Sequence, residues 1–181
     1  MALSLPQLRG YFGIGAEGIS KAVNLGNLVR SAHAFGASFV FFVDPDTRLR
    51  DALATDTSSA DRQVPLYTYA SVQALQLPRR CRLVGVELVD DAIDLPSFGH
   101  PSAAAYVFGP ERGSLSAAMQ ARCDFLVRIP TRFCVNLAVA AAIVMYDRML
   151  TQGRFGERPL RPGGPVSDPA AHIHGRPVLR R

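Results

Sequence analysis

Short apolar runs typical of buried strands alternate with helical patterns along this chain of 181 residues. Residues 38–43, 82–88, 104–108 and 124–129 are such runs, with frequent β-branched or aromatic side chains. A strand that is apolar throughout needs cover on both of its faces, as the strands of parallel sheets do. The alternation therefore predicts an α/β fold in which helices cover both faces of a parallel sheet.

Three segments have the apolar spacing of helices, at residues 25–35, 116–122 and 137–150. The last of them is apolar on all sides over its first ten residues, and such a helix must be covered on all sides. One sheet face cannot do this in so short a chain. Residues 137–149 are therefore expected either to lie deep in the monomer or to form the contact of a homodimer.

Composition excludes several classes of protein. With 48% hydrophobic residues the chain is not disordered, and its longest apolar run, residues 137–146, is shorter than the roughly 20 residues of a membrane span. The first residues do not resemble a signal peptide. Cys81, Cys123 and Cys134 are odd in number and far apart, so they fit reduced thiols better than a disulfide framework or a zinc site. A cytoplasmic protein without a metal is expected.

The composition changes near Gly153, which predicts one domain over residues 1–152 and a tail over residues 153–181. The tail contains six arginines, two acidic residues and many prolines and glycines, so it supplies four of the five net positive charges. It is expected to be poorly ordered. Arginine suits phosphate, so the tail either binds nucleic acid or only keeps the chain soluble.

Residues 13–18 spell G-x-G-x-x-G, the outline of a dinucleotide-binding loop. Asp44, at the end of the next strand, would be the acid that contacts a ribose. However, the convincing helix does not begin at the third glycine, as the motif requires. An oxidoreductase that uses NAD is therefore one hypothesis, and a glycine-rich loop without a ligand is the other.

Three further segments carry polar residues at the ends of predicted elements. Asn24 is expected to cap the helix that follows, with Arg30 nearly two turns further on, where it either reaches an anion or forms a surface pair. Gly109 and Glu111 follow the buried strand at residues 104–108, and glycine there allows a ligand to approach the backbone. Asn136 is expected to cap the all-apolar helix.

Together and in this order, the three segments resemble the SpoU (TrmH-like) family of RNA 2′-O-ribose methyltransferases, in the SPOUT superfamily. The resemblance covers about residues 9–150. Two positions differ from the family pattern, because Cys134 and Ala138 stand where the family has serine, and the loop before Asn136 is shorter. The matching residues are Asn24 and Arg30, then Phe108, Gly109, Glu111 and Gly113 with Ser114 or Ser116, and then Ile129, Pro130 and Asn136.

The resemblance implies a C-terminal deep trefoil knot, a homodimer through residues 137–149, and S-adenosylmethionine as the cofactor. It assigns the cofactor to loops that contain Val86, Glu87, Leu88, Gly109, Pro110, Ile129, Cys134, Val135 and Leu137. It also implies methyl transfer to a ribose 2′-OH of tRNA or rRNA.

By the same resemblance, Arg30 is catalytic, and Asn24, Glu111 and Asn136 position it and the substrate. Arginine is nearly always protonated, so either its pKa is depressed or a phosphate oxygen takes the 2′-OH proton while Arg30 orients the ribose. Another possibility is an RNA-binding protein of the same fold that has lost catalysis. The cations expected to contact RNA are Arg9, Lys21, Arg30, Arg112 and Arg132.

Overall fold

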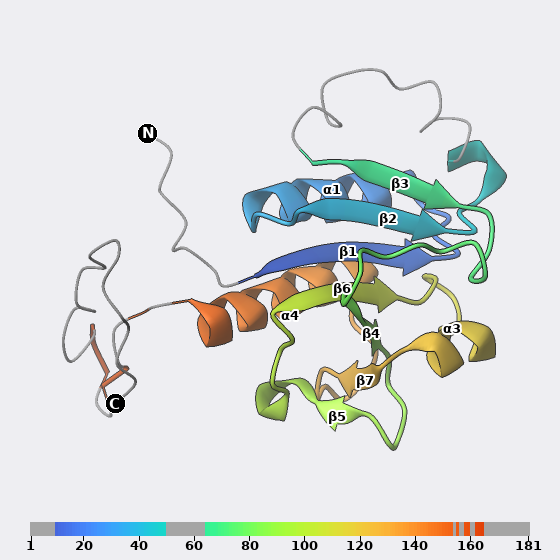
Figure 1. Cartoon of the computed structure of the whole chain (residues 1–181). Coiled ribbons are helices and arrows are strands. Elements are labelled where there is room, and N and C mark those ends of the chain that lie inside the picture. Colours follow the sequence, from blue (N-terminus) through green and yellow to red (C-terminus); the bar gives the residue numbers. More distant parts are fainter. Residues whose placement is uncertain (1–9, 50–63, 154, 156–157, 160–161, 165–181) are drawn as a thin grey trace.

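The computed structural model describes residues 10–49, 64–153, 155, 158–159 and 162–164 (Figure 1). Seven strands form one sheet in the order β3-β2-β1-β6-β4-β7-β5, and neighbouring strands run parallel. The sheet predicted from the apolar runs is therefore confirmed. The strands are β1 (Tyr11–Glu17), β2 (Phe39–Val43), β3 (Leu66–Tyr69), β4 (Arg82–Val86), β5 (Ile93–Asp94), β6 (Ala103–Phe108) and β7 (Phe125–Arg128).

Helices cover both faces of this sheet. α1 (Ala22–Ala34) and α4 (Leu137–Gln152) pack together against one face, and α3 (Ala117–Arg122) lies on the other. Strand β2 shows why its residues are apolar throughout. Val40 and Phe42 belong to the core under α1 and α4, whereas Phe39 and Phe41 belong to the core under α3.

Two of the three glycines of the G-x-G-x-x-G segment lie in a strand and Gly18 follows it directly, so both hypotheses that placed the segment in a loop are wrong. Gly13 and Gly15 lie within β1, which pairs with β2 on one side and β6 on the other. A Cβ on Gly13 would lie 2.2 Å from the Phe39 ring, and one on Gly15 would lie 2.7 Å from the Phe41 ring. The glycines make room for aromatic side chains of the next strand, and the motif provides no phosphate-binding loop.

Besides β1, two strands and a short helix lie outside the four apolar runs predicted as strands. β3 is partly exposed at the edge of the sheet, and the two-residue β5 is too short to leave a pattern, as is the 3-10 helix η1 (Leu95–Ser97). The expected helix at residues 25–35 begins earlier, at Ala22. The helix at residues 137–150 extends to Gln152, and the Ser116 side chain caps α3 by accepting a hydrogen bond from the Met119 N–H.

The C-terminal half of α4 is fastened to the sheet by a buried arginine. The Arg148 guanidinium donates hydrogen bonds to the carbonyls of Pro101 and Ser102 at 2.6 and 2.9 Å, and it lies 5.3 Å from the centre of the Phe12 ring. The side chain is 1% exposed. These acceptors replace the water that a buried cation loses.

The described part of the chain has no helix that is long and apolar enough to cross a membrane. Arg9 and most of the basic tail at residues 153–181 lie outside the described residues. The trefoil knot stays a prediction.

A buried histidine beside Arg148 makes the stability of the fold depend on pH. His100 lies between the Tyr106 hydroxyl, 2.6 Å from Nδ1, and the Asp147 carboxylate, 2.9 Å from Nε2. Burial lowers the pKa of His100 below its usual value of 6.5, although the hydrogen bond to Asp147 opposes this change. Burial raises the pKa of Tyr106 to about 12, so its hydroxyl stays protonated.

We expect the free energy of unfolding to fall as the pH drops below 6.5, because the unfolded chain then binds a proton that folded His100 resists. The variant His100→Gln should lose this part of the pH dependence. Urea unfolding of both proteins between pH 7 and pH 5 measures the difference. Parallel pH profiles for the wild type and the variant would contradict the assignment to His100.

Candidate cofactor pocket

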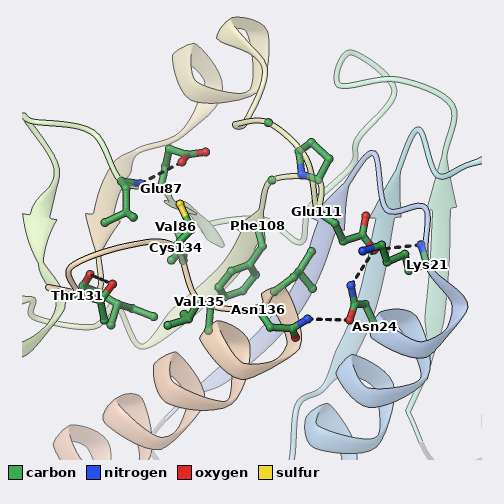
Figure 2. Close-up of a pocket in the computed structure, with 17 residues that line it drawn as sticks. Lys21, Asn24, Val86, Glu87, Phe108, Glu111, Thr131, Cys134, Val135 and Asn136 are labelled. Atoms are coloured by element: carbon green, nitrogen blue, oxygen red, sulfur yellow. Dashed lines mark hydrogen bonds between the residues drawn. The ribbon is translucent and has the colours of Figure 1, made fainter.

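A cavity of about 290 Å³ opens where the carboxyl ends of β4, β6 and β7 meet the beginnings of α1 and α4 (Figure 2). Its volume is close to the lower limit of the range of about 300 to 1,000 Å³ for small-molecule sites. In parallel sheets, ligands bind at this end of the strands. The lining residues are Lys21, Asn24, Val86, Glu87, Leu88, Phe108, Gly109, Pro110, Glu111, Gly113, Ile129, Thr131, Cys134, Val135, Asn136, Leu137 and Ala140.

All the residues expected to hold a cofactor lie in this lining, although the role itself is a prediction. Asn24, Glu111 and Asn136 line the same cavity. Phe108 and Gly113 match the motifs but have no expected role, and Thr131 and Ala140 are not among the expected site residues. Thr131 follows the Ile-Pro pair directly and Ala140 lies one turn after Asn136, so loop position and helical spacing could have indicated them.

The Glu111 carboxylate joins the loop after β6 to the start of α1. It accepts hydrogen bonds from the backbone N–H groups of Ser20 and Lys21 at 3.1 and 3.0 Å. It also accepts from the Ser20 hydroxyl and from the Asn24 amide, both at 3.0 Å. Glu111 therefore satisfies N–H groups at the beginning of α1 that have no partner within the helix.

The Asn24 side chain extends this connection to α4. Its Oδ1 accepts a hydrogen bond from the Asn136 amide at 3.0 Å (Figure 2). The Asn136 Oδ1 accepts from the backbone N–H groups of Ala138 and Val139, so the expected N-cap of α4 is confirmed. The expected N-cap role of Asn24 is wrong, because Lys21 occupies that position and Asn24 lies in the first turn, buried between two polar partners.

This environment keeps Glu111 ionised. Partial burial alone would raise the pKa of its carboxyl group, but hydrogen bonds from Asn24 and Ser20 outweigh burial and lower the pKa below the usual value of 4.5. The carboxylate is therefore an acceptor near neutral pH.

Two more carboxylates position the backbone that follows Gly109. Glu87 accepts a hydrogen bond from the Leu115 N–H at 2.7 Å, and Glu17 accepts from both the N–H and the hydroxyl of Ser116, at 2.8 and 2.6 Å. A Cβ on Gly109 would lie 2.9 Å from the Leu115 nitrogen. The loop is thus held so close to itself that only glycine fits at Gly109 without a backbone shift.

Arg30 does not line the cavity. It lies in a neighbouring groove between α1 and α4, which it shares with Phe35, Val139 and Tyr146, and Asn136 borders both hollows. Among the other expected RNA contacts, Lys21 lines the cavity, whereas Arg112 and Arg132 are exposed on loops that follow β6 and β7.

Comparison with known proteins assigns the chain that forms this cavity to a family. The model of the SpoU rRNA Methylase family matches residues 12–146. The chain belongs to the SpoU rRNA methylase family. The matched residues include all the segments that meet at the cavity, from the beginning of α1 to the first half of α4.

A relative within the TrmH family is longer than this chain. A relative from Staphylococcus haemolyticus, assigned to the TrmH family of tRNA/rRNA methyltransferases, is 27% identical over 149 residues, which cover 78% of this chain and 59% of that protein. This chain therefore spans about three fifths of the length of that relative.

Solved structures share the fold. AviRb from Streptomyces viridochromogenes in complex with the cofactor AdoMet has a TM-score of 0.66 at 24% identity, covering 83% of this chain and 62% of its own. An AdoMet-bound rRNA methyltransferase from Sinorhizobium meliloti has a TM-score of 0.65 at 21% identity, with coverage of 79% and 57%. A structure concerned with 2-OH methylation on tRNA has a TM-score of 0.64 at 23% identity, with coverage of 80% and 92%.

We expect Glu111→Gln to lower the free energy of unfolding by about 1 to 3 kcal/mol, because its amide places N–H groups against the donors that now reach a carboxylate. Urea unfolding at neutral pH measures this loss. Arg112→Gln, at the next and exposed position, is the matched control and should change stability little. Equal stability of the two variants would mean that the Glu111 connection does not hold the segments together.

Proposed function

We propose that this protein transfers a methyl group from S-adenosylmethionine to a ribose 2′-OH of tRNA or rRNA. Membership of the SpoU rRNA methylase family supports methyl transfer to RNA. The observation that carries the proposal is the single cavity in which the three motif segments meet. The shared fold of two AdoMet-bound structures supports the choice of cofactor.

The chemistry of the lining fits this cofactor. Val86, Leu88, Ile129 and Leu137 supply apolar surface for an adenine ring, and the carboxylates of Glu87 and Glu111 suit a molecule with a positive sulfonium. Gly109 lines the cavity at the point where the loop packs closely against Leu115. S-adenosylmethionine, when bound, supplies a methyl group that is attached to a positively charged sulfur.

The residues between the cavity and the groove would then bind the acceptor ribose. Asn136 borders both hollows and is fixed by its cap and by Asn24, so it defines where the two meet. Arg30 is exposed in the groove, where its guanidinium can hold a ribose or phosphate oxygen. A 2′-OH must lose its proton as it attacks. Either a deprotonated Arg30 takes that proton, or protonated Arg30 orients the ribose while a phosphate oxygen of the RNA takes it.

An RNA-binding protein without catalysis is the competing proposal. Cys134 and Ala138 replace two serines of the family pattern, and Cys134 lines the cavity while Ala138 lines the groove. The network of Glu111, Asn24 and Asn136 uses neither side chain, which favours the active enzyme.

The decisive experiment measures transfer of labelled methyl from S-adenosylmethionine into bulk tRNA and rRNA, followed by nucleoside analysis. A 2′-O-methylated nucleoside is the expected product. RNA and cofactor binding without any transfer would favour the competing proposal, whereas a base-methylated product would contradict the ribose assignment.

We expect Arg30→Ala to lower kcat by about 100-fold or more, within the usual contribution of proton-transfer or charged transition-state groups. Adenosylhomocysteine affinity, measured by calorimetry, should change little because Arg30 lies outside the cavity. Arg79→Ala, at another exposed arginine, is the control. Full activity of Arg30→Ala would remove Arg30 from the catalytic machinery.

We expect Gly109→Ala to weaken adenosylhomocysteine binding at least tenfold, because the new Cβ displaces the backbone around Leu115. The matched control is Gly26→Ala, since a Cβ there meets nothing within 4 Å and alanine favours the helix. Calorimetry compares the two variants. If both bind as tightly as the wild type, the loop after β6 does not form the cofactor site.

We also propose a homodimer through residues 137–149 of α4, which form one side of this groove, whereas Arg30 lies on the α1 side. Val139 and Tyr146 on α4 are 50% and 48% exposed, and Phe35, Ala142 and Ile143 line the groove with them. An apolar helix face of this kind is stabilised by a second copy. Sedimentation should give the mass of a dimer, and Val139→Asp should give a folded monomer. A monomeric wild type would contradict this surface.

A further inference from the structure

The two most exposed large hydrophobic side chains in the described part of the chain are each next in sequence to a residue that lines the cavity. Phe133 is 77% exposed in the loop before α4, and Val23 is 66% exposed in the first turn of α1. Their chain neighbours line the cavity, since Cys134 follows Phe133 and Asn24 follows Val23. Single exposed hydrophobic residues are common on proteins, but these two flank one candidate site.

The loop that carries Phe133 is held in a fixed turn. The Thr131 hydroxyl donates to the Phe133 carbonyl at 2.9 Å and also lies 3.3 Å from the Ile129 carbonyl, and the Thr131 N–H donates to Ile129 at 2.8 Å. Asn136 caps α4 at the end of the same loop. The backbone of Phe133 is therefore anchored on both sides, while its ring faces water at the rim.

Each exposed apolar side chain has a cation close by in the sequence. Exposed Arg132 precedes Phe133, and Lys21, the only lysine of the chain, lies two residues before Val23. An aromatic ring next to a cation matches a nucleotide, whose base stacks on the ring and whose phosphate contacts the charge. A purely apolar partner would leave the cations without a role.

We propose that Phe133 is a substrate-positioning residue that stacks on an RNA base at the mouth of the cavity, with Arg132 against the phosphate of the same or the next nucleotide. This inference rests on the proposed function, because it takes RNA as the substrate. Stacking on an anchored loop would hold the acceptor ribose over the cavity. Phe133 is not one of the residues that match the three family motifs, although it lies between Pro130 and Asn136 of the third.

The test measures binding of the full chain to fluorescently labelled bulk tRNA and rRNA fragments, with and without adenosylhomocysteine. Phe133→Ala and Phe133→Leu should weaken RNA binding roughly 5- to 150-fold, the loss of one stacked base, and raise KM more than they lower kcat. Phe133→Trp should restore binding. Tyr67→Ala, at an exposed aromatic residue on the edge strand β3, is the control and should bind normally.

Several results would overturn the proposal. Weaker adenosylhomocysteine binding by Phe133→Ala would mean that the ring covers the cofactor, and a loss of dimer mass in sedimentation would mean that it contacts a protein. Wild-type affinity of Phe133→Leu would exclude stacking, and absence of RNA binding by the wild type would exclude an RNA contact altogether. If the wild type binds RNA through Phe133 but transfers no methyl group, only the proposed catalysis fails.

Discussion

A chain of hydrogen bonds from Glu111 through Asn24 to Asn136 joins three segments that are far apart in the sequence. The two end residues also accept hydrogen bonds from backbone N–H groups that helix geometry leaves without a partner, Glu111 at the beginning of α1 and Asn136 at the beginning of α4. Because the buried Asn24 has partners on both sides, loss of either neighbour leaves a polar group unpaired. The shape of the cavity therefore depends on this connection.

The parallel sheet could be predicted from the sequence because strands covered on both faces are apolar at every position, as β2 and β6 are. The edge strand β3 is partly exposed and the two-residue β5 is very short, so neither had a strong pattern. Gly13 and Gly15 were misinterpreted for a physical reason. The same lack of a side chain that admits a phosphate also admits the rings of Phe39 and Phe41, and sequence alone does not distinguish the two.

The candidate site was predictable in its composition but less so in its connections. The motif residues mark loops that line one cavity, because the carboxyl ends of parallel strands meet at one edge of the sheet. Asn24 is predicted to cap a helix because asparagine is a frequent cap. Its side-chain partners are instead Glu111 and Asn136, which lie 87 and 112 positions further along the sequence. Such long-range hydrogen bonds leave no periodic signal, and neither does the groove in which Arg30 lies, apart from the cavity.

Asn136 stands at the boundary between the cavity and the groove, so the proposed cofactor and the proposed acceptor ribose meet beside a side chain that cannot turn freely. The most direct measurement is a crystal structure of the full chain with adenosylhomocysteine. It should place the ligand in the cavity, between Val86, Gly109 and Ile129, with its sulfur toward Asn136. A ligand bound elsewhere, or no ligand at saturating concentration, would contradict the assignment of this cavity as the methyl-donor site.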